Sequence, residues 1–189
     1  MLTQANPAEQ GLGRPRDVRI DEAVLHATRE LLLESGYAGL SLTAIAQRAG
    51  TTRPALYRRW PSLDHLVHEA AFPRALTLTG DGAARPDIRS LVAGSLDAFA
   101  HPVARAAAPG LVAAITADPS LHRALLTRFS EALGGVEQPL LDLVAGAAFF
   151  ALLLHPGDLD AEPGRSAWVD RITALLTEES EKEEGPHDD

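Results

Sequence analysis

The sequence predicts an all-α protein with a small N-terminal helical domain followed by a larger helical bundle. Apolar residues recur at helical spacing from Val18 onward. Prolines and glycines stand where the helices are expected to begin and end. No alternation of the kind that strands show persists over more than a few residues.

The composition is that of a globular protein with enough apolar residues to build a core: 46% of the 189 residues are hydrophobic. The absence of cysteine excludes disulfides, thiolate zinc sites and cysteine nucleophiles. No N-terminal leader pattern is present. The longest apolar stretch, residues 140–154, contains Asp142 and is shorter than the roughly 18–20 residues that span a bilayer. We therefore expect a cytoplasmic protein without membrane contact.

Charge is distributed unevenly along the chain, whose net charge is −9. Residues 1–75 carry nine basic and eight acidic side chains, whereas residues 76–189 carry eight basic and eighteen acidic ones. Such asymmetry is typical of a protein whose one end meets a polyanion while the other end stays in solution. Residues 180–189 are expected to form a disordered acidic tail.

Local signals define the first two helices. Apolar residues at helical spacing predict a helix over residues 18–33, and Gly36 ends it. Ser41 is a good N-cap for a second helix that ends near Ala49. Gly50 then permits a tight turn.

Two more helices follow that turn. Thr52 is expected to cap the third helix through the amide of Ala55, and this helix runs to Trp60. Ser62 caps a fourth helix over residues 63–72. Later helices are expected at about 87–100, 109–117, 119–133, 139–154 and 166–179, each beginning near a proline or another start signal.

The third helix is expected to have an inward and an outward side. Leu56 and Trp60, four residues apart, face inward and meet the small face of the second helix, formed by Ile45, Ala46 and Ala49. The outward side then carries Arg53, Tyr57 and Arg58, with Arg59 flanking. Such a helix can enter a major groove, where Arg pairs with guanine and Tyr or Arg holds phosphates. The alternative is a solvated charged face.

This segment resembles the DNA-binding domain of the tetracycline-repressor (TetR) family. The resemblance covers roughly residues 18–72 and is carried by Ser41-Leu42, Ile45-Ala46, Ala49-Gly50, Thr52, Leu56-Tyr57, Arg59-Trp60 and Ser62. Glu34-Ser35-Gly36-Tyr37 is similar to the family's exit from the first helix. Two positions depart from the pattern: Leu63 stands where a phosphate-gripping lysine is usual, and Thr51 where valine is usual.

The resemblance implies a regulator that acts as a repressor, binds a palindromic operator and is released by a small-molecule effector. Tyr57 is implied as a phosphate contact. The expected DNA-binding residues are Thr43, Thr52, Arg53, Pro54, Tyr57, Arg58 and Arg59. Arg14 and Arg16 of the N-terminal arm are expected to reach the minor groove, and the alternative for this arm is a solvated tail.

We divide the chain accordingly. Residues 1–16 form a flexible basic arm, 17–62 the helix-turn-helix domain and 63–179 the ligand-binding and dimerisation domain, followed by the tail. The apolar effector is expected to contact Phe99, Phe129, Phe149 and Phe150. A segment that is hydrophobic all round, residues 140–154, must be covered on every side. The expected homodimer contacts are Leu143, Gly146, Phe150, Leu153, Trp168, Ile172, Leu175 and Leu176.

Other functions receive less support from the sequence. Asp142 is either a structural group at a dimer seam, which we favour, or a pocket residue. His65 and His68 have no further ligand at convincing spacing, so no metal site and no cofactor are expected. No phosphate loop or nucleophile motif indicates an enzyme. The alternative to a regulator is a helical interaction module without specific DNA recognition.

Overall fold

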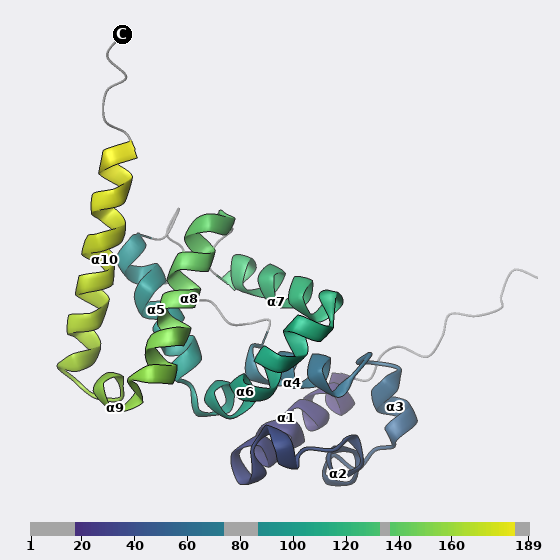
Figure 1. The fold of residues 1–189 in the computed structure, drawn as a ribbon. Helices are drawn as coiled ribbons and strands as arrows, with labels where there is room; N and C mark the ends of the chain where they lie inside the picture. The colour runs from purple at the N-terminus through teal and green to yellow at the C-terminus, as the bar shows by residue number, and fades with distance from the viewer. Residues whose placement is uncertain (1–17, 74–86, 133–136, 184–189) are drawn as a thin grey trace, which may run out of the picture.

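The computed structural model describes residues 18–73, 87–132 and 137–183. Within these ranges all regular structure is helical, as the sequence predicts (Figure 1). The N-terminal helices cluster at one end of the molecule, and α10 lies at the opposite end. The N-terminal elements are α1 (Val18–Ser35), the 3-10 turn η1 (Tyr37–Gly39), α2 (Leu42–Arg48), α3 (Arg53–Tyr57) and α4 (Leu63–Ala71).

Capping residues set the ends of these helices as predicted. The Ser41 hydroxyl accepts the amide of Ala44 at 3.1 Å, and the Ser62 hydroxyl accepts the amide of His65 at 3.3 Å. Gly36 and Gly50 both have φ near +65°, the left-handed conformation that glycine adopts without a Cβ clash. The sequence therefore specifies both the exit from α1 and the turn after α2.

A small hydrophobic core lies among α1, α2, α3 and α4. Its buried side chains are Val24, Ile45, Ala46, Leu56, Trp60 and Leu66. Removing each large apolar side chain from water contributes about 1.5–3 kcal/mol. This core holds α3 against the rest of the domain, although α3 itself is too short to be stable alone.

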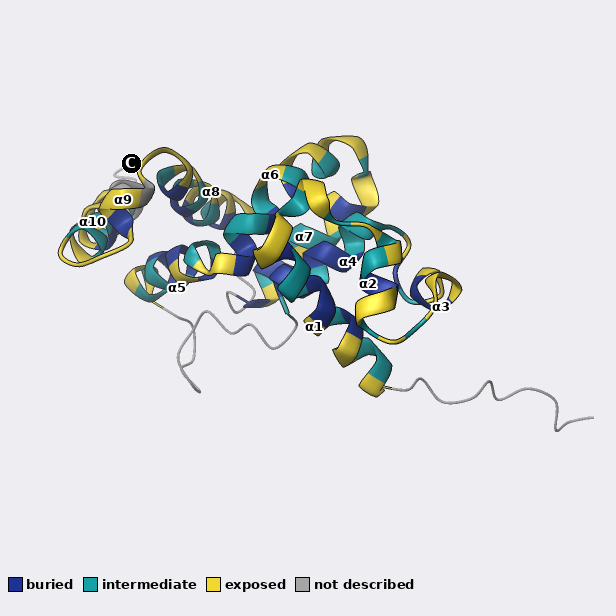
Figure 2. Ribbon diagram, turned by 90° about the horizontal axis from the view of Figure 1, so that it is seen from below, coloured by how far each residue is buried: buried dark blue, intermediate teal, exposed yellow. Residues whose placement is uncertain are grey.

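The C-terminal elements form a larger bundle. α5 packs along α8, α10 packs on α5, and α6 lies between α4 and α7 (Figures 1 and 2). α3 and α10 lie at opposite ends of the molecule, and exposed residues occur on most of the helices between them (Figure 2). The elements are α5 (Ile88–Ala100), α6 (Pro102–Ala117), α7 (Pro119–Ala132), α8 (Gln138–Leu154), α9 (Pro156–Leu159) and α10 (Gly164–Glu183).

The predicted start of α6 was wrong. A helix was expected to begin at Pro109, but α6 begins at Pro102, and Pro109 lies inside it. The ring nitrogen Nδ1 of His101 accepts the amide of Val103 at 3.3 Å and so caps this start. Pro109 costs the helix one backbone hydrogen bond, and packing of α6 against α4 and α7 holds it helical nonetheless.

Two other boundaries and one capping bond also differ from expectation. α3 ends at Tyr57 rather than at Trp60, and its Thr52 hydroxyl makes no capping bond. Instead, the backbone carbonyl of Thr52 accepts the amide of Ala55 at 3.0 Å. α10 continues to Glu183, beyond the expected end near residue 179, so residues 180–183 are helical rather than part of a disordered tail. The rest of that tail, 184–189, lies outside the described residues.

The two cores share two helices. α1 contributes Val24 to the small core and Leu32 to the large one. α4 contributes Leu66 to the small core and Val67 to the large one, and Phe72, which follows the last residue of α4, also lies in the large core. A movement of α4 therefore acts on both halves of the molecule.

Within the described ranges, no single helix is both long and apolar enough to cross a membrane. α5 and α6 meet that criterion of length and composition only as a pair, which is bent by 83°.

Candidate functional site

The first candidate surface is the exposed side of α3. Leu56 and Trp60 are buried in the small core, and the Trp60 indole N–H donates to a Glu69 carboxylate oxygen at 2.9 Å. Since Glu69 lies on α4, this bond ties the end of the α3 segment to α4. The segment is thus anchored along one side by packing and by a charge-assisted hydrogen bond.

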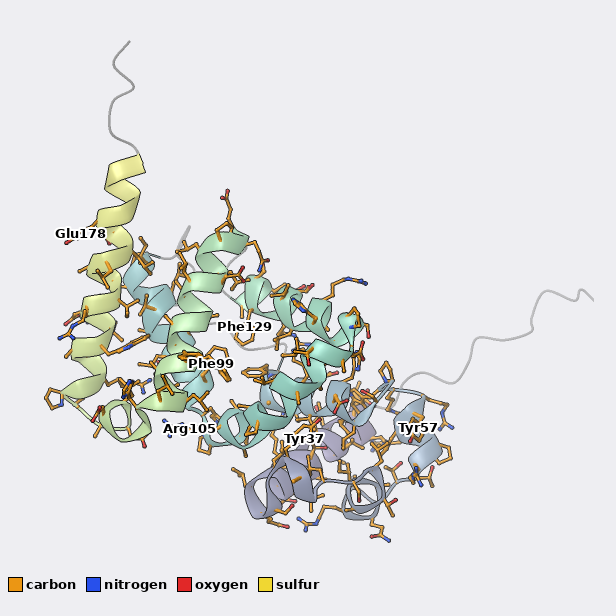
Figure 3. All side chains as sticks on the ribbon, in the orientation of Figure 1. Tyr37, Tyr57, Phe99, Arg105, Phe129 and Glu178 are labelled. Carbon is orange, nitrogen blue, oxygen red and sulfur yellow. The ribbon has the colours of Figure 1, made fainter. Side chains whose placement is uncertain are left out.

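The opposite side of α3 is open to solvent. Arg53 and Arg58 are exposed, and Tyr57 is 52% exposed at the outer edge of the molecule (Figure 3). Arg53 Nη2 donates to the Tyr57 hydroxyl at 3.4 Å, and its guanidinium carbon lies 6.0 Å from the ring centroid. The guanidinium of Arg53 and the phenol of Tyr57 thus contact each other on the solvent-exposed side of α3.

Arg59 does not lie on the exposed side of α3, where it was expected to flank Arg58. Its side chain is only 11% exposed, and its guanidinium forms an ion pair with Asp21 of α1 and donates to the carbonyl of Ala55 at 3.2 Å. This arginine links α3 to α1 rather than standing free beside Arg58. No local sequence signal joins Asp21 to Arg59, because they lie 38 residues apart.

The remaining expected DNA-binding residues lie around this surface. Thr43, Thr52 and Pro54 are exposed on α2 and at the start of α3. Arg14 and Arg16 lie outside the described residues.

A second arginine fixes α2 against α1. Arg48 makes two hydrogen bonds of 2.9 Å to the Glu34 carboxylate and approaches Glu30 at 3.4 Å. The bond from Arg48 holds the pKa of Glu34 below its ordinary value. These exposed ion pairs orient the two helices and contribute little to the free energy of unfolding.

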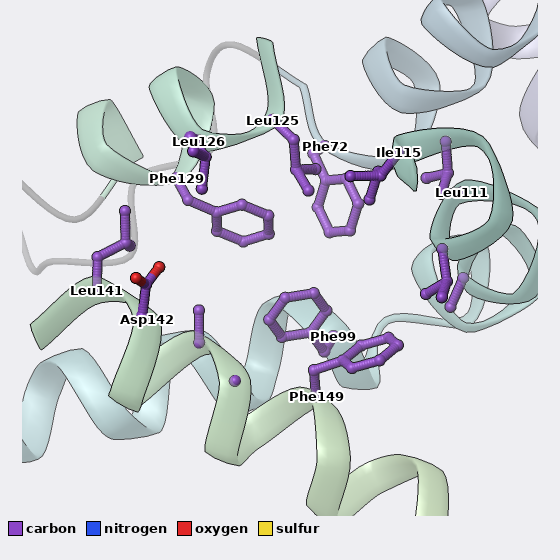
Figure 4. A pocket seen from close by; sticks show the side chains of 14 residues that line it. Phe72, Phe99, Leu111, Ile115, Leu125, Leu126, Phe129, Leu141, Asp142 and Phe149 are labelled. Atoms are coloured by element: carbon purple, nitrogen blue, oxygen red, sulfur yellow. The ribbon is translucent and has the colours of Figure 1, made fainter. Parts of the chain in front are cut away.

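The second candidate site is an apolar cavity of about 240 Å³ in the C-terminal half (Figure 4). Of the four phenylalanines expected to contact an effector, Phe99, Phe129 and Phe149 line it. Phe72, which lies just beyond the end of α4, also lines it and was not anticipated, because no sequence pattern brings residue 72 near helices that begin after residue 87.

Phe150 does not line this cavity. Its side chain is 59% exposed and borders a neighbouring cavity of about 420 Å³, which shares Phe99 and Phe149 with the first. Phe150 therefore lies on the side of α8 that faces solvent.

The phenylalanines of the first cavity contact one another. Ring centroids lie 5.1 Å apart for Phe72 and Phe129 and for Phe99 and Phe129, and 5.4 Å apart for Phe99 and Phe149. Asp142 of α8 also lines the cavity, and the Gln138 side-chain amide donates to its carboxylate at 2.8 Å. Asp142 therefore has the position expected of a pocket residue, one of its two alternatives, and the other alternative, a group at a dimer seam, stays a prediction.

A third candidate surface is an apolar face of α8. Leu143, Phe150 and Leu153 are each 58–59% exposed, and a Cβ at Gly146 would meet nothing within 4 Å. The residues of α10 that we expected to join them behave differently. Trp168, Ile172 and Leu176 pack partly buried against the large core of the same chain, and Leu175 is exposed.

The histidines singled out in the sequence occupy separate settings. The His65 ring lies 3.0 Å from the Ser62 hydroxyl and 3.3 Å from the Ser120 hydroxyl. His68 is buried beside Phe72, with ring centroids 6.1 Å apart. Among the described residues, no group of three His, Asp or Glu side chains is arranged to hold a metal ion.

Comparison with known proteins supports the interpretation of the N-terminal half. The family described as bacterial regulatory proteins of the tetR family matches residues 24–70, from α1 to α4. The uncharacterized HTH-type transcriptional regulator Mb2274c of Mycobacterium bovis is 36% identical over 64 residues, which cover 31% of this chain and 34% of the relative. The corresponding regulator YdeS of Bacillus subtilis is 40% identical over 48 residues, covering 25% and 24%. The chain thus spans about a third or less of the length of these relatives.

Solved structures extend the similarity to the whole fold. A TetR transcriptional regulator from Rhodococcus sp. RHA1 has a TM-score of 0.61 at 19% identity, and the match covers 87% of this chain and 97% of that chain. At this identity the match shows the fold alone. Residues 24–70 thus match the DNA-binding domain of the tetR family of bacterial regulatory proteins, and the described chain as a whole has the fold of a TetR regulator.

Proposed function

We propose that this protein is a DNA-binding transcriptional regulator that acts as a homodimer on a palindromic operator and is released, as a repressor, by a small-molecule effector. The observation that carries the proposal is the two-sided α3 segment. Leu56 and Trp60 are buried, while Arg53, Tyr57 and Arg58 face solvent. Guanidinium groups on a rigidly anchored helix match both the base edges and the phosphates of a major groove.

Each exposed residue has a proposed role at the DNA. Arg58 reads a guanine, Arg53 and Tyr57 hold phosphates, and Thr43, Thr52 and Pro54 contact the neighbouring backbone. Arg59 supports α3 through Asp21 and contributes to DNA binding by holding the surface in place. Arg14 and Arg16 of the arm reach the adjacent minor groove.

The apolar face of α8 is the proposed subunit interface. Leu143, Phe150 and Leu153 are large apolar side chains exposed along one helix, and Gly146 among them permits close approach of a second helix. Leu175 of α10 lies at the edge of this interface, with Trp168, Ile172 and Leu176 supporting α10 from within the subunit. A two-fold axis through it gives two recognition helices for two half-sites about one helical turn apart.

The aromatic cavity is the proposed effector site. Phe72 forms part of its wall and follows α4, and Glu69 on α4 holds Trp60 of the recognition segment. A ligand that displaces Phe72 shifts α4, and α4 carries that shift to α3. This route links effector binding to the spacing of the two recognition helices. We propose no catalytic role, and we place the protein in the cytoplasm with the chromosome.

Selection of duplexes from random DNA by the purified protein tests the proposal. We expect enrichment of one palindromic sequence. Arg58→Ala should weaken its binding by about 1–3 kcal/mol and relax preference at one base position in each half-site. Arg123→Ala, the same change at an exposed position on α7, should leave both unchanged. Failure to enrich any sequence would instead favour a helical interaction module.

The proposed interface has its own test. Leu143→Glu should convert the dimer to a monomer in sedimentation velocity, because a carboxylate would be buried at the seam. Leu33→Glu is the matched control, since Leu33 on α1 is 57% exposed and lies outside α8. A Leu143→Glu protein that sediments as the wild-type dimer would contradict this interface.

A further inference from the structure

The aromatic cavity of the C-terminal half contains a single ionisable group. Of the fourteen described residues that line it, only Asp142 carries a charge, and the others are apolar. Figure 4 shows the Asp142 carboxylate at one side of the cavity, with Phe129 above it and Phe99 and Phe149 beyond. The Asp142 side chain is exposed to solvent, and it is the one charged group among these lining residues that a ligand in the cavity would meet.

One oxygen of the Asp142 carboxylate already accepts a hydrogen bond within the protein. The Gln138 side-chain amide donates to Asp142 Oδ1 at 2.8 Å, which fixes the carboxylate from the N-terminal turn of α8. A ligand that fills the cavity displaces water from the rest of the carboxylate. Removing water from a charged group is costly unless the ligand supplies an opposite charge or donors.

The phenylalanine cluster also favours a ligand that carries a positive charge. The faces of aromatic rings carry negative electrostatic potential and attract cations within about 6 Å of their centroids. Phe72, Phe99, Phe129 and Phe149 all line the cavity, with neighbouring centroids 5.1–5.7 Å apart. They supply apolar area for a hydrocarbon body and a favourable setting for an ammonium group.

The acidic excess of the C-terminal part of the chain also favours a cationic ligand. Residues 76–189 carry eighteen acidic and eight basic side chains. Their field attracts cations and repels anions as a ligand approaches. Arg105 borders the neighbouring cavity rather than this one, and its guanidinium is paired with Asp160.

We propose that the effector of this protein is a small lipophilic cation, with an ammonium group beside Asp142 and an aromatic or alkyl body among the phenylalanines. This inference rests on the proposed function, because it names the ligand class of the proposed effector site. A cavity of about 240 Å³ limits the ligand to roughly one ring with a short chain.

Three probes of equal length separate charge from hydrophobicity: 4-phenylbutylammonium, 4-phenylbutanol and 4-phenylbutyrate. Their dissociation constants are measured by isothermal titration calorimetry on the full-length protein without DNA. We expect the ammonium probe to bind at least about 10-fold more tightly than the alcohol, and the carboxylate probe to bind most weakly. In Asp142→Asn, which keeps size and polarity, the preference of the ammonium over the alcohol should fall to within about 2-fold.

Glu137→Gln is the matched control, because Glu137 is an exposed acid just before α8 that does not line the cavity. It should retain the wild-type preference. Equal binding of all three probes, tighter binding of the carboxylate, no binding of any probe, or an unchanged preference in Asp142→Asn would each overturn the inference. Operator binding is measured separately by mobility shift, so a protein that selects cations yet binds no DNA would contradict the proposed function alone.

Discussion

The aromatic ring of Tyr37 lies against Gly110, in the space that a Cβ atom at that position would occupy. Its hydroxyl donates a hydrogen bond to Asp64, and burial together with this bond raises the pKa of Tyr37 above its ordinary value. Tyr37 belongs to η1 and Gly110 to α6, so the contact joins the N-terminal helices to the C-terminal bundle (Figure 3). The glycine is required there by close approach, since α6 is helical at that residue.

Gly110→Ala is therefore expected to destabilise the protein. The added methyl group overlaps the Tyr37 ring, and the resulting strain of about 1–3 kcal/mol exceeds the roughly 1 kcal/mol that alanine gains over glycine in a helix. Urea denaturation measures the change in the free energy of unfolding. In a Tyr37→Ala background the same substitution should instead stabilise, because the ring is absent. A stabilising effect with Tyr37 in place would show that the ring moves aside freely.

Arg58 and Arg59 are adjacent, yet their replacement should affect different properties. Arg59→Ala removes one partner of Asp21 and a bond to the Ala55 carbonyl, so it should lower the free energy of unfolding by about 1–2 kcal/mol. Arg58→Ala should leave that free energy unchanged within about 0.5 kcal/mol, because Arg58 is exposed. Chemical denaturation of both variants, followed by mobility shift, separates the roles. Equal losses of stability would contradict the assignment.

Because Trp60 donates a hydrogen bond to Glu69, we expect Trp60→Phe to lower the free energy of unfolding substantially. Phenylalanine cannot donate to Glu69 and leaves space in the small core, so the free energy of unfolding should fall by about 2 kcal/mol or more. Trp168→Phe on α10, where the tryptophan is only partly buried, should cost less. The chain has two tryptophans, so each variant keeps one fluorescent reporter for the denaturation curve. A larger loss in Trp168→Phe would contradict the role of Trp60 as the anchor of α3.

Protonation of the Asp118 carboxylate is expected to lower the stability of the folded protein in acid. Hydrogen bonds from the hydroxyl and amide of Ser120, at 2.7 and 2.8 Å, hold the pKa of Asp118 below its ordinary value of 3.8. Because the folded pKa is the lower one, this contribution is present above about pH 4 and is lost as the pH falls through the folded value. Asp118→Asn can still accept these bonds without titrating. Denaturation between pH 3 and 6 should show wild type losing stability relative to Asp118→Asn only below about pH 4, and a constant difference would contradict this.

Local chemistry made much of the N-terminal half predictable. The caps at Ser41 and Ser62 and the glycine turn at Gly50 depend on neighbouring residues, which the sequence shows directly. The burial of Leu56 and Trp60 followed from their spacing of one helical turn. The outward side of α3 then followed, because a helix that buries one side exposes the other.

Contacts between distant segments were not predictable in the same way. Asp21 pairs with Arg59, and Phe72 joins the cavity, only because the helices that carry them pack together. Proline favours the first turn of a helix, which predicts a helix start at Pro109, whereas tertiary packing keeps Pro109 inside α6. Trp168 formed part of an apolar stripe, and the sequence could not tell whether its own chain or a second subunit would cover it.

If the apolar face of α8 is the subunit interface that we propose, it also affects each chain before it pairs with a second one. Four large apolar side chains of α8 are exposed to solvent: Leu143, Phe150, Leu153 and Leu154. A newly synthesised chain that remains monomeric is therefore prone to aggregation and proteolysis. Abundance in the cell should then rise more steeply than synthesis, because pairing is second order in chain concentration. A duplicated gene would become independent of its parent only after substitutions at these four side chains prevented mixed pairs.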